Sequence, residues 1–327
     1  MDAMELNTFP VAREQIVDRR HKLEHAIVAL GPRPELTSLL AEVDAALERI
    51  AVGSYGLCET CHEAIEADRL LADPLTRFCL DHLSPSEQRA LEQDLQLAAR
   101  VQTGLLPDIA KLPAAWDVGY AYRPARIVSG DYCDVVALDG DLFFMIGDVS
   151  GKGVAAATVM AQLHAMFRAL LPAGLPLGEL VARASRLFCE STLPTHYATL
   201  VCGRATAAGE VEICKAGHVH PLVVSGGTAT PLPPGGMPVG MFCSQRFEAQ
   251  RVRLGRGDMI VLCTDGVTEA EGPESEQYGV ARLARAVQER ASDSARQVVD
   301  ACVRSVDAWR AGRRADDDVT VMVVRRA

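Results

Sequence analysis

Apolar residues recur at three- and four-residue steps along the first hundred positions of the chain. Residues 11–30 and 35–52 show this helical spacing, and "LGPRPEL" with its two prolines and a glycine separates them. A short break between two amphipathic helices predicts an antiparallel helical hairpin. Residues 86–105 predict a further helix before Pro107. Its apolar stripe must be buried against its own domain or against a second copy of the chain.

The pattern changes beyond Pro107 to short apolar runs of β-type composition that are separated by glycine-rich turns. These runs are "DVVALDG", "LFFMIGD", "YATLVCGRA", "EVEICKAG", "PLVVSG", "FEAQRVRL", "DMIVLCTDG" and "VTVMVVRR". Two helical blocks, residues 152–171 and 279–310, interrupt them. Strands in series with inserted helices predict one layered α+β domain.

Composition excludes several classes of protein. The 327 residues are 49% apolar and 23% charged, which is typical of a globular protein with two or three domains. A net charge of -10 argues against a general binder of nucleic acid or anionic membranes, because both need clustered Lys and Arg. We find neither a signal peptide nor an uninterrupted apolar stretch of roughly 18 residues. We therefore expect a cytoplasmic protein without nucleic-acid or membrane partners.

The cysteines fall into two groups. Seven of the ten lie singly in apolar contexts, where a reduced thiol behaves as a small buried hydrophobe. They are Cys133, Cys189, Cys202, Cys214, Cys243, Cys263 and Cys302. The other three are bunched: Cys58 and Cys61 form C-x-x-C, and Cys79 begins C-x-x-H with His82 after seventeen intervening residues. This spacing supplies three thiolates and an imidazole to one structural zinc ion. His62 is a rival ligand, but its adjacency to Cys61 makes it geometrically poor.

Aspartates stand at the ends of four predicted strands. They are Asp131 and Asp134 in "SGDYCD", Asp148 in "IGDVSGKG", Asp265 in "LCTDGVTEA" and Asp316–Asp318 in "ADDDVTVMVV". If these ends meet, the carboxylates repel one another unless hard divalent cations neutralise them. We interpret Asp139, Asp141 and Asp258 as ordinary turn residues.

Oxygen-rich carboxylate sites suit Mg²⁺ or Mn²⁺, and paired ions of this kind activate water for attack on a phosphate ester. The sequence therefore predicts a metal-dependent phosphohydrolase. It contains no G-x-S-x-G motif and no P-loop that would indicate another mechanism.

Three other residues allow two interpretations each, and a fourth, Ser150, allows one. Arg126 is a candidate ligand of the substrate phosphate or an exposed loop residue, and Lys152 neutralises phosphate charge or is simply solvated. His218 approaches the metal edge or is a hydrogen-bonded structural histidine. Ser150 is expected to cap the helix that follows it.

The N-terminal third resembles the DksA/TraR zinc-finger family over roughly residues 1–85. The segment "ALERIAVGSYGLCETCHEAIEADRLLADPLTRFCLDH" carries this resemblance. In that family a hairpin with acidic residues at its tip can enter the secondary channel of RNA polymerase. Here the tip holds one Glu and two prolines without paired aspartates, so we interpret the module as a docking, sensing or dimerising domain.

Residues 95–327 resemble the SpoIIE/RsbU-like branch of the metal-dependent type-2C Ser/Thr protein phosphatases. The motifs "AARVQTGLLP", "RPARIVSGDYCDVV", "FFMIGDVSGKGVAAATVMA", "AGHVHPLVV", "GGMPVGM", "LGRGDMIVLCTDGVTEA" and "DDVTVMVV" occur in the order of that branch. The resemblance implies an α-β-β-α sandwich with a pair of Mn²⁺ or Mg²⁺ ions at one edge.

The same resemblance implies a role for each acidic residue. Asp148 would bridge the two metals together with the backbone carbonyl of Val149. Asp265 and Asp317 would ligate one ion, and Asp131 would lie near the other; Asp134 and Asp318 are weaker candidates. The resemblance also implies that the substrate is a phosphorylated anti-sigma-factor antagonist of the STAS fold. It implies in addition that the region upstream of the phosphatase domain regulates activity.

These expectations define three regions and three candidate functions. The regions are a hairpin with a zinc finger (1–83), a connector helix (84–106) and a phosphatase domain (107–327). The leading hypothesis is a phosphoprotein phosphatase regulated through its zinc module and dimeric through the connector. The alternatives are a catalytically weak adaptor that docks on the transcription machinery, and a small-molecule phosphatase or nucleotidase. The presence of all four acidic strand ends favours the enzyme.

Overall fold

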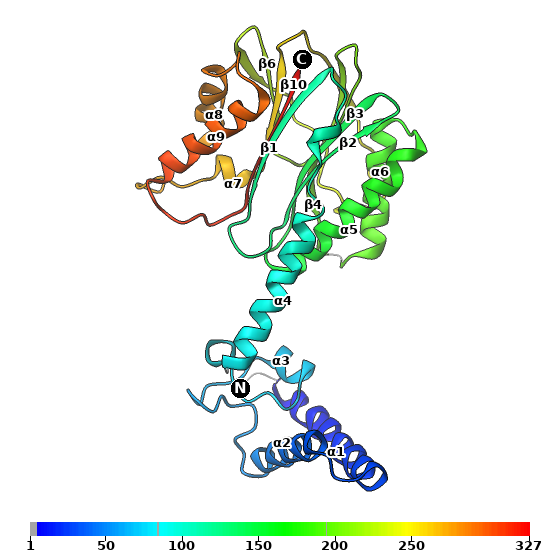
Figure 1. The fold of residues 1–327 in the computed structure, drawn as a ribbon, viewed down its shortest axis with the longest axis vertical. Helices are drawn as coiled ribbons and strands as arrows, with labels where there is room; N and C mark the ends of the chain where they lie inside the picture. Colours follow the sequence, from blue (N-terminus) through cyan, green and yellow to red (C-terminus); the bar gives the residue numbers. More distant parts are fainter. Residues whose placement is uncertain (1–4, 84, 194) are drawn as a thin grey trace. The chain divides into compact units, whose positions relative to one another are not determined.

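The computed structural model describes residues 5–83, 85–193 and 195–327 (Figure 1). The chain divides into two compact units, Met1–Gln93 and Asp94–Ala327. Each unit has its own apolar core. The predicted connector helix is present as α4 (Pro85–Thr103), and the boundary between the units falls within it.

The N-terminal unit contains the predicted hairpin. Helix α1 (Glu5–Leu30) is joined by three residues to α2 (Pro34–Ala51), which starts on a proline, and the first helical turn tolerates this residue. The buried side chains between them are Ile16, Leu23, Val43 and Ala46. Arg20 and Asp44 form an exposed ion pair of 2.7 Å between the helices. The short helices α3 (Ala67–Ala72) and η1 (Leu80–His82) follow.

The C-terminal unit contains two antiparallel sheets of five strands. In spatial order the first sheet is β1 (Trp116–Arg123), β10 (Val319–Arg326), β9 (Met259–Cys263), β6 (Leu222–Ser225) and β7 (Thr228–Pro231). The second is β2 (Asp131–Leu138), β3 (Asp141–Val149), β4 (Ala198–Ala205), β5 (Glu210–Ala216) and β8 (Ala249–Arg253). Side chains from both sheets form a continuous core between them.

Helices cover the outer face of each sheet (Figure 1). Helices α5 (Val154–Leu170) and α6 (Leu177–Ser191) share a core with the second sheet. Helices α8 (Gly279–Gln288) and α9 (Ala295–Arg310) share a core with the first. The predicted α-β-β-α sandwich is therefore confirmed. The remaining short helices are η2 (Ile109–Lys111), η3 (Leu171–Ala173) and α7 (Asp265–Thr268).

Several elements differ from the sequence prediction. Strands β1 and β7 and helix α6 were not predicted, and the block 279–310 forms two helices instead of one. The break lies at Ser294, whose side chain and backbone exchange hydrogen bonds with Gln297 in a capping box that starts α9. Strand β1 contains Gly119, and a Cβ atom there would lie 2.8 Å from the backbone of Ala295. The close packing of α9 on this strand therefore requires the glycine.

Helix α5 is apolar because it belongs to the core. Residues 154–173 are long enough for a membrane span and have a mean hydropathy of 1.4. The side chains that face the second sheet are buried in the protein core; they are Ala156, Val159, Met160, Leu163 and Phe167. This packing explains the high hydropathy of residues 154–173.

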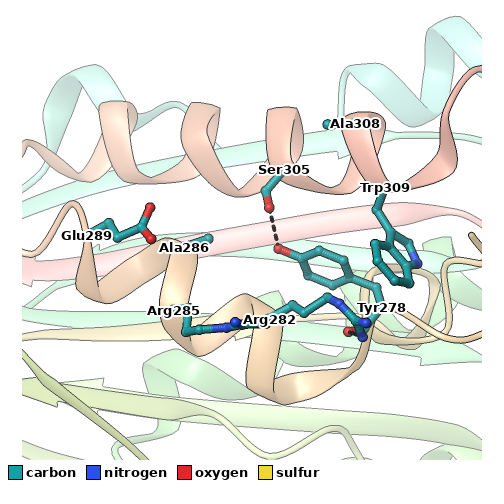
Figure 2. A pocket seen from close by; sticks show the side chains of 8 residues that line it. All are labelled: Tyr278, Arg282, Arg285, Ala286, Glu289, Ser305, Ala308 and Trp309. Atoms are coloured by element: carbon teal, nitrogen blue, oxygen red, sulfur yellow. Dashed lines mark hydrogen bonds between the residues drawn. The ribbon is translucent and has the colours of Figure 1, made fainter.

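A hollow of about 380 Å³ lies between α8 and α9 (Figure 2). Tyr278 donates a hydrogen bond of 2.7 Å to Ser305, and the Arg282 guanidinium lies 3.7 Å from the centroid of the Trp309 ring. None of its lining residues belongs to the predicted sites. This hollow is therefore distinct from the acidic edge described below.

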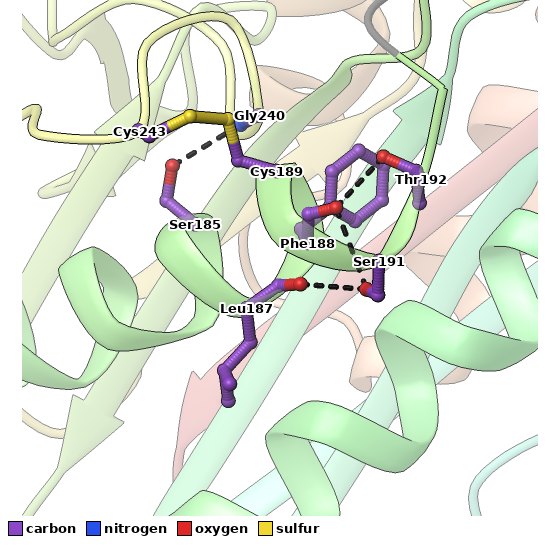
Figure 3. Close-up of a disulfide and its surroundings, with 8 residues drawn as sticks. All are labelled: Ser185, Leu187, Phe188, Cys189, Ser191, Thr192, Gly240 and Cys243. Carbon is purple, nitrogen blue, oxygen red and sulfur yellow. Dashed lines mark hydrogen bonds between the residues drawn. A yellow bond between two sulfur atoms is a disulfide. The ribbon is translucent and has the colours of Figure 1, made fainter.

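The prediction of seven buried, reduced cysteines is confirmed for five and wrong for two. Cys189 of α6 and Cys243, in the loop between β7 and β8, form a disulfide with Cα atoms 5.6 Å apart (Figure 3). Cys243 is exposed, as is its neighbour Phe242, because both lie on the surface of this loop. The apolar sequence context of Cys243 therefore did not indicate burial.

Candidate functional site

Strand pairing brings two of the acidic strand ends together in the second sheet. Asp131, the first residue of β2, lies opposite Asp148 near the end of β3. A Cβ atom at Gly130 would lie 3.1 Å from the carbonyl oxygen of Val149 and 3.2 Å from Oδ1 of Asp148. Both oxygens therefore lie close to Gly130, on the side where any other residue would place its side chain.

The first sheet supplies the other two acidic ends. Strand β9 ends at Cys263, two residues before Asp265, and it pairs with β10, which begins directly after the triple aspartate. A Cβ atom at Gly266 would lie 2.0 Å from the carbonyl oxygen of Asp318, so only glycine allows this approach. The two acidic segments thus lie against each other.

Asp131 joins the two sheets at this edge. Its Oδ2 atom accepts hydrogen bonds from the hydroxyls of Thr264, at 2.9 Å, and Thr320, at 2.5 Å. Burial raises the pKa of Asp131 well above its usual range. The two hydroxyl hydrogen bonds oppose this rise, and the nearby charge of Asp148 adds to it. No sequence pattern indicated the two threonines, which come from β10 and from the residue after β9.

The carboxylates at the edge repel one another. Burial is the main reason that the pKa of Asp148 rises to about 7, and the charges of Asp265, Asp317 and Asp318 add to the effect. Burial raises the pKa of Asp265 as well, and the negative charge of Asp317 raises it further. The structure therefore brings Asp131, Asp148, Asp265 and Asp317 into one electrostatic cluster, as the four strand ends predicted.

Lys152 is the cation nearest to Asp317 among the described ion pairs. Its Nζ atom donates to Asp317 Oδ2 at 2.9 Å and to the carbonyl oxygen of Asp316 at 3.1 Å. Lys152 is exposed to solvent and also pairs with the acidic edge, so both interpretations of it stay open. Arg126 is exposed in the loop between β1 and β2, and its charge opposes the rise in the pKa of Lys152. Lys152 thus acts directly on the acidic edge, and Arg126 lies close enough to act on Lys152.

Two of the weaker aspartate candidates have structural partners instead. Asp318 accepts the backbone N–H groups of Ala125 at 2.7 Å and Gly130 at 3.0 Å, which fixes the loop before β2. Asp134 is buried and forms a bidentate ion pair with Arg168 of α5, at 2.6 and 2.7 Å. Both carboxylates therefore help to hold the fold, while Asp318 also lies close enough to raise the pKa of Asp148.

Ser150 and Thr199 organise the turn that follows β3. The prediction that Ser150 caps α5 is wrong, because Gly153 occupies the N-cap position. Instead, Ser150 accepts the backbone N–H of Tyr197 through Oγ and donates its own N–H to the Tyr197 carbonyl. Thr199 donates to the Asp148 carbonyl at 3.4 Å. No sequence motif indicated these contacts, which depend on the pairing of β3 with β4.

His218 supports this turn from within the protein. Its Nδ1 atom lies 2.7 Å from Thr199 Oγ1, and burial lowers its pKa to about 4. The ring is therefore neutral near pH 7 and is a hydrogen-bonded structural histidine, the second of the two interpretations.

The residues at the acidic edge fit hard divalent cations. Their donors are carboxylate and carbonyl oxygens, which Mg²⁺ and Mn²⁺ prefer, and their mutual repulsion would be relieved by positive charge. Among the described residues, the only group of three or more potential ligands within 4.8 Å of one another lies in the N-terminal unit. The aspartates are spread more widely, as expected for residues that share ions with water molecules.

That compact group consists of the predicted ligands Cys58, Cys61, Cys79 and His82. The Sγ atoms of Cys61 and Cys79 are 3.8 Å apart, and Cys79 Sγ lies 3.3 Å from His82 Nδ1. Two thiolates bound at ~2.3 Å to one tetrahedral zinc ion would be separated by about 3.8 Å. His62 is exposed and lies outside the group. The geometry therefore fits a closed, four-ligand metal centre.

Comparison with known proteins matches two parts of the chain. Residues 138–327 match the family model "Stage II sporulation protein E (SpoIIE)", and residues 53–81 match the prokaryotic dksA/traR C4-type zinc finger. The zinc-finger description implies four cysteines, whereas this chain places His82 in the fourth position.

Curated relatives and solved structures agree with the first match. The chain is 28% identical to protein IcfG of Synechocystis over 71% of its own length and 41% of that protein. It is 26% identical to the phosphoserine phosphatase RsbU of Bacillus subtilis, over 73% of this chain and 72% of RsbU. The SiaA-PP2C domain of Pseudomonas aeruginosa superimposes with a TM-score of 0.67 at 18% identity, covering 75% of this chain and all of that domain. The last likeness shows the fold alone.

The family match covers more than half of the chain, and it spans the elements that carry Asp148, Asp265 and Asp317. The chain spans less than half the length of IcfG, so whole-protein properties do not transfer from that relative. The shared sandwich and the acidic edge at the strand ends agree with the same assignment. This chain belongs to the SpoIIE family, whose fold is that of the PP2C-type phosphatase domain.

Proposed function

We propose that this chain is a cytoplasmic, Mn²⁺- or Mg²⁺-dependent phosphoprotein phosphatase that acts on phosphoserine or phosphothreonine. The observation that supports it most is the meeting of four acidic strand ends at one edge of the sandwich. Burial and mutual repulsion raise the pKa of Asp148 there to about 7. Proteins maintain such a costly arrangement at functional sites, where bound cations offset it.

The family resemblance implies a role for each acidic residue, and the positions of these residues at one edge agree with it. Asp148 and the Val149 carbonyl would hold both ions, Asp265 and Asp317 would hold one, and Asp131, deeper in the protein, would act on the other. When bound, the paired ions would activate a water molecule for in-line attack on the phosphorus atom. Thr264 and Thr320 orient Asp131, since both hydroxyls donate to the same carboxylate oxygen.

The two cations beside the site suit recognition of phosphate. Lys152 donates to Asp317 and would exchange this contact for a substrate phosphate oxygen once Asp317 holds an ion. Arg126 is exposed in the loop that Asp318 fixes, where its guanidinium is free to bind phosphate bidentately. Neutral His218 would act through Thr199 to position the Asp148 backbone, and not as a proton donor.

The substrate class is inferred from the family resemblance. The order of motifs and the likeness to RsbU favour a phosphorylated anti-sigma-factor antagonist of the STAS type. The competing adaptor hypothesis does not explain why all four acidic strand ends meet at one edge. A nucleotidase would need a pocket for a base, whereas the pocket that Asp317 lines at the acidic edge has a volume of about 170 Å³ and is lined mainly by charged side chains.

The activity is tested by metal-dependent release of inorganic phosphate. We expect the purified full chain to hydrolyse an aryl phosphate and a phosphoserine peptide with Mn²⁺, and to lose this activity in EDTA. Added Mn²⁺ should restore it, because ions held by the aspartates would activate the attacking water. Hydrolysis that continues unchanged in EDTA, or its absence at saturating Mn²⁺ and Mg²⁺, would contradict the proposal.

The connector and the zinc module are proposed to regulate this activity. Helix α4 exposes apolar side chains at Leu91, Leu97 and Val101, with exposed fractions of 46%, 52% and 60%. A second copy of the chain would cover this stripe in a homodimer. A shift in helix packing would then couple residues 1–83 to the acidic edge.

The double substitution Leu91→Glu with Leu95→Glu is expected to weaken dimerisation and to change the turnover rate without altering zinc content. Two carboxylates on the apolar stripe would have to lose water at the dimer interface. Light scattering and turnover measure the two effects; the control is Arg89→Glu, which changes the net charge by the same amount at an exposed position on another face of α4. An unchanged mass together with an unchanged rate would reduce α4 to a tether.

A further inference from the structure

The disulfide between Cys189 and Cys243 lies at the surface of the C-terminal unit (Figure 3). Its Cα atoms are 5.6 Å apart, which lies in the usual range for a disulfide, so the pair can form and break without large backbone movement. Cys243 is exposed and Cys189 is half-buried. The five unpaired cysteines of the same unit are all buried. Solvent oxidants and reductants therefore reach this pair before any other thiol of the unit.

The C-terminal unit does not depend on this bond for a core. Two sheets and two helix layers enclose three clusters of buried apolar side chains. Disulfides that occur in reducing compartments are mostly transient, catalytic or redox-sensing. Since the chain is proposed to be cytoplasmic, a reversible pair is the interpretation that agrees with both the compartment and the position of the bond.

The disulfide holds a defined loop. Residues 232–248 connect β7 to β8 and contact α6, β4 and β5; the Gly236 N–H donates to the Lys215 carbonyl of β5, and Phe247 is buried in the core that includes α6. The Gly240 N–H donates to Ser185 Oγ of α6 at 3.1 Å, one helical turn from the disulfide. Val239 exchanges backbone hydrogen bonds with Ala198 of β4, at 2.8 and 2.9 Å. Among the described residues, no hydrogen bond joins residues 241–247 to α6, and the disulfide links the two covalently.

The loop lies one strand away from the proposed catalytic turn. Ala198, which pairs with Val239, also lies opposite Val149 in the register of β3 and β4. The preceding residue, Tyr197, exchanges two hydrogen bonds with Ser150. The loop is therefore two backbone contacts away from the turn after Asp148, which places its surface beside the proposed site.

Exposed apolar side chains gather on the loop and on the segment that it contacts, and we call them the rim patch. Each is between 38% and 64% exposed. They are Leu193, Tyr197, Met237, Met241 and Phe242. A gathering of exposed apolar side chains marks a protein-contact surface. A phosphoprotein that presents its phosphate to the acidic edge must approach this surface, because Tyr197 contacts the turn after Asp148.

We propose that Cys189 and Cys243 are a reversible redox pair that sets the conformation of the rim patch and thereby the affinity for the phosphoprotein substrate. This inference rests on the proposed phosphatase function. A hydroperoxide is the oxidant: the Cys243 thiolate attacks its outer oxygen and forms a sulfenic acid, and an alcohol or water leaves. The Cys189 thiolate then displaces hydroxide, which leaves as water after taking up a proton. Two electrons pass from the thiols to the peroxide, and a dithiol reductant reverses the step by thiol–disulfide exchange.

The experiment compares the full chain after anaerobic reduction and after oxidation with hydrogen peroxide. Mass spectrometry of digested samples should show the Cys189–Cys243 peptide only after oxidation. The probes are an aryl phosphate and a serine-phosphorylated STAS-domain protein. We expect the KM for the phosphoprotein to differ between the two states by about fivefold or more, the range typical of coupled sites. Turnover of the aryl phosphate, which is too small to contact the loop, should change less than about twofold.

Matched variants separate this effect from oxidation elsewhere. Cys243→Ser should keep the KM of the reduced protein in both conditions, whereas Cys302→Ser, a buried single thiol, should respond as wild type. Zinc content measured in the same samples reports damage to the N-terminal thiols. If the KM of Cys243→Ser still responds to oxidation, the effect comes from thiols other than this pair, and the proposal is overturned. An equal KM in both states when the disulfide has formed would overturn it too. Absence of aryl phosphate turnover in both states would instead contradict the phosphatase function itself.

Discussion

Replacement of Asp148 or Asp265 by Asn is expected to lower Mn²⁺-dependent phosphatase activity by about 10²–10³-fold or more, the loss typical of removing one transition-state contact of this kind. Each substitution removes a negative charge that the proposed ion pair requires, while the amide keeps the size of the side chain. Phosphate release at saturating Mn²⁺ measures the effect, and Mn²⁺ titration of each variant by isothermal calorimetry should show weaker binding. Near wild-type turnover at saturating metal would remove this mechanism.

The electrostatics of the site predict that this loss does not come from unfolding. The pKa of Asp148 is about 7 in the folded, metal-free protein, above its ordinary value of 3.8. The folded state therefore binds more protons than the unfolded state between these values, and this residue makes the metal-free protein less stable as pH rises through the window. The amide introduced by Asp148→Asn carries no such charge. In EDTA at pH 8, this variant should therefore melt no lower than wild type.

The matched control for these substitutions is Asp139→Asn. Asp139 lies in the exposed turn between β2 and β3 with a φ of 52°, a conformation that Asn adopts readily. We expect both turnover and melting temperature to be nearly unchanged. A loss as large as that of Asp148→Asn would mean that turn aspartates and site aspartates have been sorted wrongly.

Cys58→Ser is expected to release zinc from the N-terminal unit and to unfold residues 55–83 locally. Closed sites of this ligand type bind zinc with apparent free energies on the order of 10 kcal/mol or more, and that binding energy stabilises the fold around the ion. Metal analysis should find about one zinc per wild-type chain and much less in the variant. Hydrogen exchange should rise in residues 55–83, whereas the C-terminal unit, which has its own core, should keep its protection.

His62→Ala is the control for the zinc site. His62 is adjacent to Cys61 but is exposed and lies outside the group of ligand atoms. Zinc content and hydrogen exchange should therefore match wild type. Anaerobically purified wild-type protein without zinc, or a Cys58→Ser variant that retains it, would contradict the assignment of the four ligands.

Local patterns determined much of this structure. The period of apolar residues predicted the hairpin, the connector helix and eight of the ten strands, because a helix or strand must bury a face that recurs at its own period. The zinc ligands were predictable because all four lie within one short segment, so their spacing alone limits the geometry. The acidic strand ends were recognisable since buried carboxylates after apolar runs are costly.

Tertiary structure decided which neighbouring aspartates face the site. Asp317 and Asp318 are adjacent, yet one faces Lys152 and the other holds the loop before β2. Asp131 and Asp134 share a strand, and only strand register determines that Asp134 faces Arg168 of α5. Side chains alternate between the faces of a strand, so the sequence predicts that they separate but not which one reaches the edge.

Contacts between distant segments were likewise settled only by the fold. The hydroxyls on Asp131 come from Thr264 and Thr320, which are 133 and 189 residues away along the chain. The disulfide links Cys189 to Cys243 across 54 residues, and a single cysteine in an apolar context gives no sign of its partner. Sequence periodicity therefore determined the elements and the types of ligand. The packing of sheets and helices determined which residues meet, because that depends on register and layer contacts that no local pattern encodes.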